Sequence, residues 1–281
     1  MALRYDPGEI ITAMVTPFNE KREIDYNKAE DLAKYLISHG SDALLVAGTT
    51  GEGPTLTHEE EFELLSTVKR AVANKAKVIM NAGSNSTRTA IMAAKWAQKE
   101  DVDAILSVVP YYNKPSQEGM IEHFSTVAES TDLPIIIYNI PGRTGVNMLP
   151  YTVAKLAEKY QNIVAIKQSF GDMDAVTEMK LLCPEDFTIY SGDDSLTLPM
   201  MALGAITANA EETKGMLFNE EQVTEEQHAP KHDTPHYDRD NGVVPIADDR
   251  GFTLQSKDGK FIFKPYLFVQ TSLNFNYYDD E

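Results

Sequence analysis

Lys167 is the residue of this sequence whose surroundings best suit covalent chemistry. It directly follows the apolar run 163–166, which is typical of a buried strand. A lysine in so desolvated a position is expected to have a lowered pKa, and the neutral amine forms imines with carbonyl compounds. The alternative is a structural lysine whose ammonium group reaches from the strand end into solvent.

Four further side chains have types that could work with such an amine. Tyr138 ends the apolar run 134–138 and can relay protons during imine formation, or it is an ordinary buried tyrosine. Arg143 lies in a loop with proline and glycine, where it can hold a carboxylate through two hydrogen bonds or form a surface salt bridge. Thr49 and Thr50 stand between glycines, which favours a carboxylate site over a helix cap.

A repeated unit of strand and helix positions these residues. Apolar runs that suit buried parallel strands occur at 11–15, 43–47, 77–82, 104–109, 134–138, 163–167 and 187–191. Amphipathic helical periods occur between them at 26–38, 59–73, 87–98, 117–129, 149–159 and 174–182. We predict an α/β fold of the TIM (β/α)8 barrel type, truncated after its seventh βα unit, with the candidate side chains at the carboxyl ends of the strands.

The rival fold is a doubly wound sheet. The first strand runs into Thr16-Pro17-Phe18 and is not followed by a glycine-rich dinucleotide fingerprint, which counts against the rival. A short eighth strand around 205–210 remains open, but no eighth helix is recognisable.

The composition restricts the partners. The chain has 281 residues, a formal net charge of -18 and 42% hydrophobic residues. An acidic protein of this kind is not expected to bind nucleic acid or anionic membranes. The single cysteine, Cys183, and the absence of a long apolar run or a signal peptide at the N-terminus favour a cytoplasmic protein.

Four motifs carry a resemblance to a known family. They are Thr-Thr-Gly-Glu at 49–52, Tyr-Tyr-Asn-Lys-Pro at 111–115, Tyr-Asn-Ile-Pro-Gly-Arg-Thr-Gly at 138–145 and Ile-Lys at 166–167. In this order they resemble the dihydrodipicolinate synthase family of lysine and diaminopimelate biosynthesis, over about residues 7–205. The resemblance implies a lyase that joins pyruvate to aspartate semialdehyde, giving 4-hydroxy-tetrahydrodipicolinate without a cofactor.

The resemblance also implies roles for the catalytic side chains. Lys167 would form the Schiff base with pyruvate, and Tyr138 would be the centre of a proton relay with Thr50 and Tyr112. In the family, the tyrosine that matches Tyr112 reaches into the neighbouring subunit. The resemblance therefore implies a homo-oligomer, a dimer or a tetramer.

The substrate-binding residues follow from the same resemblance. Thr49 and Thr50 would hold the pyruvate carboxylate, and Arg143 would receive the carboxylate of aspartate semialdehyde. We also assign Gly192 and Ile206 to substrate binding.

Feedback inhibition by lysine is not expected. His58 and Asn85 match the regulatory pocket of the family. Glu61, however, stands where the resemblance implies a histidine in lysine-sensitive members, and Thr89 stands where it implies a glutamate. A pocket without that carboxylate should bind an ammonium group poorly.

The tail does not match the family pattern. Residues 206–250 form an acidic linker without a sustained period, which we expect to be disordered, and residues 251–281 resemble a β-hairpin with its turn at 257–260. The run 196–210 resembles the end of a secretory signal, and 261–278 loosely resembles the first strands of an outer-membrane porin. His228, His232 and His236 are four residues apart, but Pro230 and Pro235 interrupt any helix that would align them, so we predict no metal site.

Two alternatives to the synthase remain open. One is an N-acetylneuraminate lyase or another keto-acid aldolase, although lyases tend to have Ser-Thr where this chain has Thr49-Thr50. The other is an inactive chimera, in which a truncated barrel carries a porin-like segment.

Overall fold

The structure is a computed structural model, which describes residues 4–205, 243–248, 251–256 and 262–263. The chain divides into two units, Met1–Glu221 and Gln222–Glu281, and each is described by itself. Within the described residues, every helix is too short or too polar to cross a membrane.

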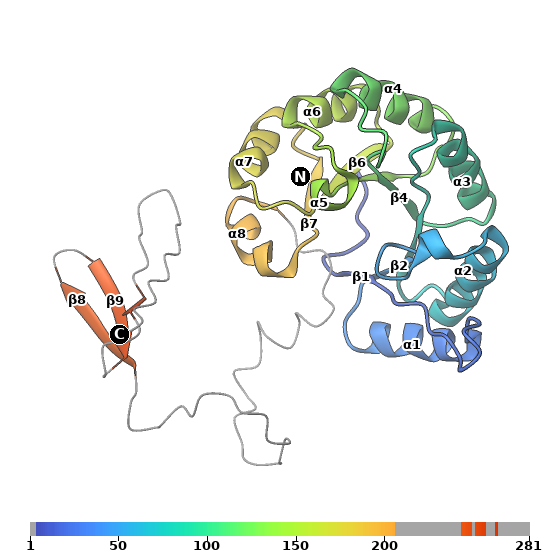
Figure 1. Cartoon of the computed structure of the whole chain (residues 1–281), viewed down its shortest axis with the longest axis horizontal. Helices are drawn as coiled ribbons and strands as arrows, with labels where there is room; N and C mark the ends of the chain where they lie inside the picture. The colour runs from blue at the N-terminus through green and yellow to red at the C-terminus, as the bar shows by residue number, and fades with distance from the viewer. Residues whose placement is uncertain (1–3, 206–242, 249–250, 257–261, 264–281) are drawn as a thin grey trace, which may run out of the picture. The chain divides into compact units, whose positions relative to one another are not determined.

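The first unit is built on a sheet of seven parallel strands. These are β1 (Ile11–Ala13), β2 (Ala43–Val46), β3 (Lys77–Asn81), β4 (Ala104–Val108), β5 (Ile135–Asn139), β6 (Ile163–Gln168) and β7 (Thr188–Ser191). They pair in chain order, each strand parallel to the next. Figure 1 shows the helices arranged around the outside of the curved sheet.

Helices connect these strands. They are α1 (Tyr26–Ser38), α2 (His58–Val72), α3 (Thr87–Lys99), α4 (Gln117–Ala128), α5 (Pro141–Thr144), α6 (Pro150–Lys159), α7 (Met173–Leu182) and α8 (Thr197–Ala202), with short 3-10 turns η1 (Gly53–Thr55) and η2 (Asp194–Leu196). Several begin at a polar cap. Thr57, for example, forms a reciprocal capping box with Glu60 at the start of α2, which satisfies two backbone donors at once.

The predicted architecture is confirmed, because the seven strands and six predicted helices occur in the expected order with ends shifted by one or two residues. Helices α5 and α8 were not among the predicted elements. Of the run 196–210, which resembles a secretory signal, residues 197–202 form α8, and Met200 and Ala205 pack in the core of the first unit; its residues from 206 on lie outside the described residues. A half-exposed amphipathic helix of this length is hard to distinguish from a uniformly apolar run.

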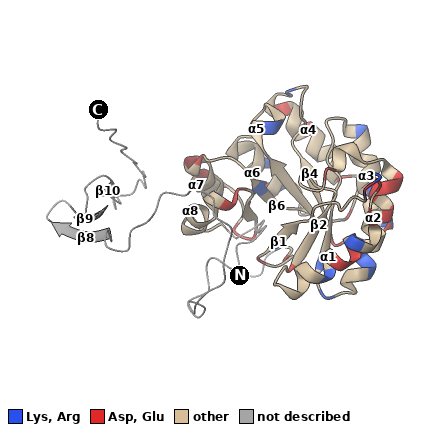
Figure 2. Ribbon diagram, turned by 60° about the horizontal axis from the view of Figure 1, so that its bottom comes forward, with Lys and Arg blue, Asp and Glu red and all other residues tan. Residues whose placement is uncertain are grey.

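Two apolar cores follow from the alternation of side chains along each strand. Ile135 and Ile137 of β5 belong to the larger core between strands and helices, whereas Ile136 and Tyr138 belong to a smaller core inside the curved sheet. Charged residues lie mainly on the outer helices (Figure 2). Only Lys77 and Lys167 are charged on the seven strands, and Lys77 is exposed.

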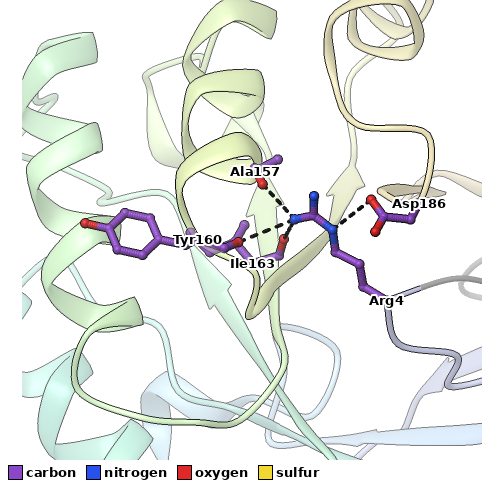
Figure 3. A network of polar contacts seen from close by, with 5 residues as sticks. All are labelled: Arg4, Ala157, Tyr160, Ile163 and Asp186. Carbon is purple, nitrogen blue, oxygen red and sulfur yellow. Dashed lines mark hydrogen bonds and ion pairs between the residues drawn. The ribbon is translucent and has the colours of Figure 1, made fainter.

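The chain before β1 is tied to the opposite edge of the sheet. Arg4 donates from Nε to Asp186 Oδ1 at 2.8 Å, just before β7 (Figure 3). Its Nη1 donates to the carbonyl oxygens of Ala157 at 2.6 Å, Ile163 at 3.4 Å and Tyr160 at 3.5 Å. One buried guanidinium thus links the segment entering β1 to α6, β6 and β7.

The second unit contains a small antiparallel sheet of order β10-β9-β8, with β8 (Val243–Asp248), β9 (Gly251–Ser256) and β10 (Ile262–Phe263). The predicted turn at 257–260 falls between β9 and β10. Strand β8 corrects the prediction that 206–250 is a linker throughout. Pro245 obscured its apolar pattern, yet a proline is tolerated here because β8 is an edge strand. The porin-like run beyond 263 lies outside the described residues.

Candidate functional site

The carboxyl ends of the strands surround a cavity of about 170 Å³. Its walls are formed by Ala13, Leu45, Thr49, Thr50, Leu106, Tyr138, Ile140, Arg143, Lys167 and Gly192. Parallel strands bring their carboxyl ends to one face, so residues far apart in the sequence meet there. Six of the eight residues assigned from the sequence line this cavity.

Lys167 and Tyr138 are direct neighbours at the centre of the site. They are paired in the register of β5 and β6, and both are buried, with exposures of 7% and 6%. The Lys167 Nζ lies 4.7 Å from the centroid of the Tyr138 ring. This distance allows a favourable contact between a cation and an aromatic face, and it places the phenol next to the amine.

An irregularity in β6 turns Lys167 towards the cavity. Ile135 pairs with Ile163, but Ile136 pairs with Ala165, so Val164 is an extra residue in β6. Val164 and Ala165 both belong to the inner core, and the alternation of faces restarts after them. Without this bulge, a lysine four residues after Ile163 would face the helices, because a shift of one residue exchanges the faces of a strand.

Tyr138 is held in its neutral form. Burial raises the pKa of Tyr138, while the nearby Ser169 and Thr49 hydroxyls and the charge of Arg143 act in the opposite direction. At neutral pH the phenol therefore carries its proton and is ready to donate it. Proton relay requires a group of this kind within reach of the reacting atoms.

Gly192 lies against the Lys167 side chain, where a larger residue has no room. A Cβ atom at this position would be 1.9 Å from Ser169 Oγ and 2.8 Å from Lys167 Cε. Real Cβ atoms do not approach other atoms so closely, so glycine lets the segment after β7 close the cavity beside the amine. This contact supplies a physical reason for the assignment of Gly192 to the site.

The polar rim of the cavity comes from two loops. Thr49 and Thr50 follow β2 in a tight turn, in which the Glu52 N–H donates to Thr49 O at 3.1 Å. Arg143 is exposed on α5, a single helical turn that begins at Pro141. Hydroxyls, backbone N–H groups and a guanidinium that line one cavity can bind anionic groups.

A second, larger cavity of about 460 Å³ adjoins the first, and Thr49, Tyr138 and Arg143 line both. Glu61 faces the larger cavity, and its Oε2 lies 3.2 Å from His58 Nδ1. Burial raises the pKa of Glu61, and the contact with His58 offsets part of that effect.

Two assigned residues are not in the cavity. Tyr112 is 89% exposed and does not line either cavity, and Ile206 lies outside the described residues. The three histidines of the tail are also outside them. Among the residues that the structure describes, no three His, Cys, Asp or Glu side chains are grouped as metal ligands.

Ser169 and the apolar residues of the cavity wall were not predicted from the sequence. Leu45 and Leu106 could have been found from strand alternation, since both face the inner core. Ser169 lies beyond β6, and no periodicity indicates that its hydroxyl lies against Gly192 in the cavity wall.

A family model described as the dihydrodipicolinate synthetase family matches residues 6–217. The chain belongs to this family. The match extends past the boundary near residue 205 that the sequence motifs predicted. The family resemblance drawn from the four motifs is therefore confirmed.

Individual members of the family are closely similar. A 4-hydroxy-tetrahydrodipicolinate synthase of a Synechococcus strain is 56% identical over 197 residues, covering 70% of this chain and 64% of the relative. One from Desulforamulus reducens is 52% identical over 199 residues, covering 71% and 67%. The chain thus spans about two thirds of the length of the curated relatives it matches.

Solved structures agree with this assignment. A crystal structure of DHDPS from Cyanidioschyzon merolae with lysine bound has a TM-score of 0.71 and 51% identity, covering 73% of this chain and 70% of that one. The dihydrodipicolinate synthase from Aquifex aeolicus has a TM-score of 0.70 and 47% identity, covering 72% and 69%. The shared part is the barrel of the first unit.

Proposed function

We propose that the chain is a lyase that condenses pyruvate with aspartate semialdehyde through a Schiff base on Lys167, giving 4-hydroxy-tetrahydrodipicolinate. One observation carries the proposal. The buried Lys167 amine and the neutral Tyr138 phenol are paired on adjacent strand ends, with Nζ 4.7 Å from the ring centroid. The names of the relatives, all 4-hydroxy-tetrahydrodipicolinate synthases at 52–56% identity, support it.

The chemistry proceeds in balanced steps. The Lys167 amine adds to the keto carbon of pyruvate, and loss of water gives the imine. Removal of a methyl proton gives the enamine, whose carbon forms a bond to the aldehyde carbon of the second substrate. Tyr138 passes protons to and from these intermediates, and hydrolysis of the imine or ring closure by the substrate amine frees Lys167.

The cavity supports small anionic substrates. Its volume of about 170 Å³ is below the range of roughly 300–1,000 Å³ that drug-sized ligands occupy, which suits a three-carbon keto acid. Thr49 and Thr50 would bind the pyruvate carboxylate, and Arg143, at the boundary with the larger cavity, would bind the second carboxylate.

Oligomer formation is part of the proposal. Tyr112 is 89% exposed, and its backbone adopts a φ of 71°, which is unusual for an aromatic residue. We propose that it completes the site of a neighbouring copy in a dimer or tetramer. A solved relative is described as a monomeric dihydrodipicolinate synthase variant, so a monomer is the alternative outcome. We place the protein in the cytoplasm because its single cysteine, Cys183, is free.

Borohydride reduction in the presence of pyruvate tests the proposed function. We expect a stable adduct on Lys167, located by peptide mass spectrometry, and no adduct in Lys167→Arg. Lys77→Arg is the matched control, because Lys77 is the other strand lysine and is exposed. An unmodified Lys167 in the folded protein would refute the proposal. Competition between aspartate semialdehyde and N-acetylmannosamine for the enamine then separates the synthase from a lyase.

A further inference from the structure

A buried pair of amides lies directly behind the Lys167 and Tyr138 pair. Asn139 and Gln168 are paired in the register of β5 and β6, one position further along both strands. Successive strand residues face opposite sides, so these two side chains lie on the side of the sheet that faces the helices. They are 0% and 1% exposed.

The Asn139 side chain joins the two strands to the loop after α5. Its Nδ2 donates to Gln168 Oε1 at 3.0 Å and to Asn147 Oδ1 at 2.8 Å, and its Oδ1 accepts the Met148 N–H at 3.1 Å. Asn147 and Met148 end the segment that carries Arg143. A single side chain therefore connects β5, β6 and the position of Arg143.

The backbones of the same two residues hold the next segments of the cavity wall. The Ser169 N–H donates to Asn139 O at 2.9 Å, and the Gly192 N–H donates to Gln168 O at 2.8 Å. The residues that follow β6 and β7 are thereby fixed to the ends of β5 and β6.

Packing alone does not explain amides at these positions. Ile135 and Ile137 occupy the same face of β5 and fill the space against the helices without polar groups. Apolar residues of similar shape would avoid the cost of burying polar groups. A hydrogen-bonded polar pair, in contrast, fixes the relative orientation of the two side chains as well as the distance between them. An arrangement of reacting groups needs this precision, because small displacements greatly slow the reaction.

We propose that Asn139 and Gln168 are positioning residues, whose amide bridge fixes the Tyr138 and Lys167 pair and holds the Arg143 segment over the cavity. This inference rests on the proposed function for its catalytic consequence. Neither side chain contacts the substrate, because both lie behind the cavity wall.

The first test compares initial rates of borohydride trapping with pyruvate in the full chain. We expect Asn139→Ala to trap at least about tenfold more slowly. Gln168→Ala should also be slow, and so should Gln168→Met, which keeps the length of the side chain but removes the oxygen that accepts the Asn139 hydrogen bond. A residue that serves only as packing would tolerate methionine.

The matched control is Asn162→Ala. Asn162 lies just before β6, at the opposite end from the site, and its Nδ2 donates to the carbonyl oxygens of Ala128 and Thr131, both at 2.9 Å. Loss of the Asn162 side chain should lower the melting temperature but leave the rate of pyruvate trapping unchanged. Equal trapping rates in Asn139→Ala and Asn162→Ala would overturn the inference.

Hydrogen exchange provides a measurement that does not depend on catalysis. The Met148 amide should exchange faster in Asn139→Ala and at the unsubstituted rate in Asn162→Ala. Unchanged exchange at Met148 would overturn the inference. If the unsubstituted protein forms no adduct with pyruvate, the proposed function fails, and the exchange of Met148 alone then decides whether Asn139 holds the loop.

Discussion

Replacement of Arg4 by alanine should destabilise the barrel strongly, although Arg4 is distant in sequence from the strands that it holds. Its side chain is only 7% exposed and bridges the start of the chain to Asp186 and to α6. The contacts to Asp186 Oδ1 at 2.8 Å and Ala157 O at 2.6 Å are strong, whereas the two at 3.4 and 3.5 Å contribute less.

The magnitude follows from these two strong bonds. A hydrogen bond that involves a charged group contributes about 1.5–3 kcal/mol, so the pair contributes roughly 3–6 kcal/mol. Asp186 is 28% exposed and regains water once Arg4 is removed, which places the expected loss near the lower end, about 3 kcal/mol. For a unit of this size, such a loss lowers the melting temperature by about 6–12 °C.

Urea denaturation and thermal melting of Arg4→Ala would measure this loss. Lys34→Ala is the control, because it removes an ion pair with Glu30 in which both partners are exposed. We expect this variant to have the same melting temperature as the unsubstituted protein. Equal melting temperatures of Arg4→Ala and Lys34→Ala would refute the view that Arg4 holds the two edges of the sheet together. A smaller slope of free energy against urea would instead indicate that part of the barrel is already open.

Three other outcomes are expected. Gly192→Ala should reduce pyruvate trapping by about 100-fold or more, because its Cβ would lie 2.8 Å from Lys167 Cε; normal trapping would contradict the close packing. Burial lowers the pKa of His123 from 6.5 to about 4, so the stability it contributes is complete above pH 6.5 and is lost as the pH falls towards 4. Urea denaturation should show a decrease of about 2 kcal/mol from this group between pH 7 and pH 5, which His123→Asn should lack. Millimolar lysine should leave more than half of the activity, since Thr89 lines the larger cavity without the carboxylate that would bind an ammonium group, and the Glu61 carboxylate there contacts His58; a rate reduced by half would disprove this.

Most of the fold could be predicted because its strands are apolar on both faces and its helices are amphipathic. A short unbroken apolar run and a longer segment with a helical period are easy to distinguish, so the order of elements follows from the sequence alone. Helix α5 was missed although Pro141 and Gly145 mark its ends, because it is only four residues long. Helix α8 lacks a side-chain cap, and its apolar residues are divided between buried Met200 and exposed Leu198.

The site could be predicted only in part. The carboxyl ends of parallel strands meet, so strand order alone indicates that Thr49, Tyr138 and Lys167 lie close together. The closeness of Ser169 to Gly192, and the contacts of Asn139 with the loop after α5, depend on side-chain directions in segments that have no period. Local sequence carries little information about such contacts.

The apolar run before Lys167 is enough to place this lysine near the end of a buried strand, because such a run leaves few other interpretations. It did not determine the face on which the lysine lies. A run that is apolar on both sides has no preferred phase, and only the pairing with β5 introduces the extra residue at Val164. That bulge, produced by the fit of two strands in the curved sheet, points the amine into the cavity beside Tyr138.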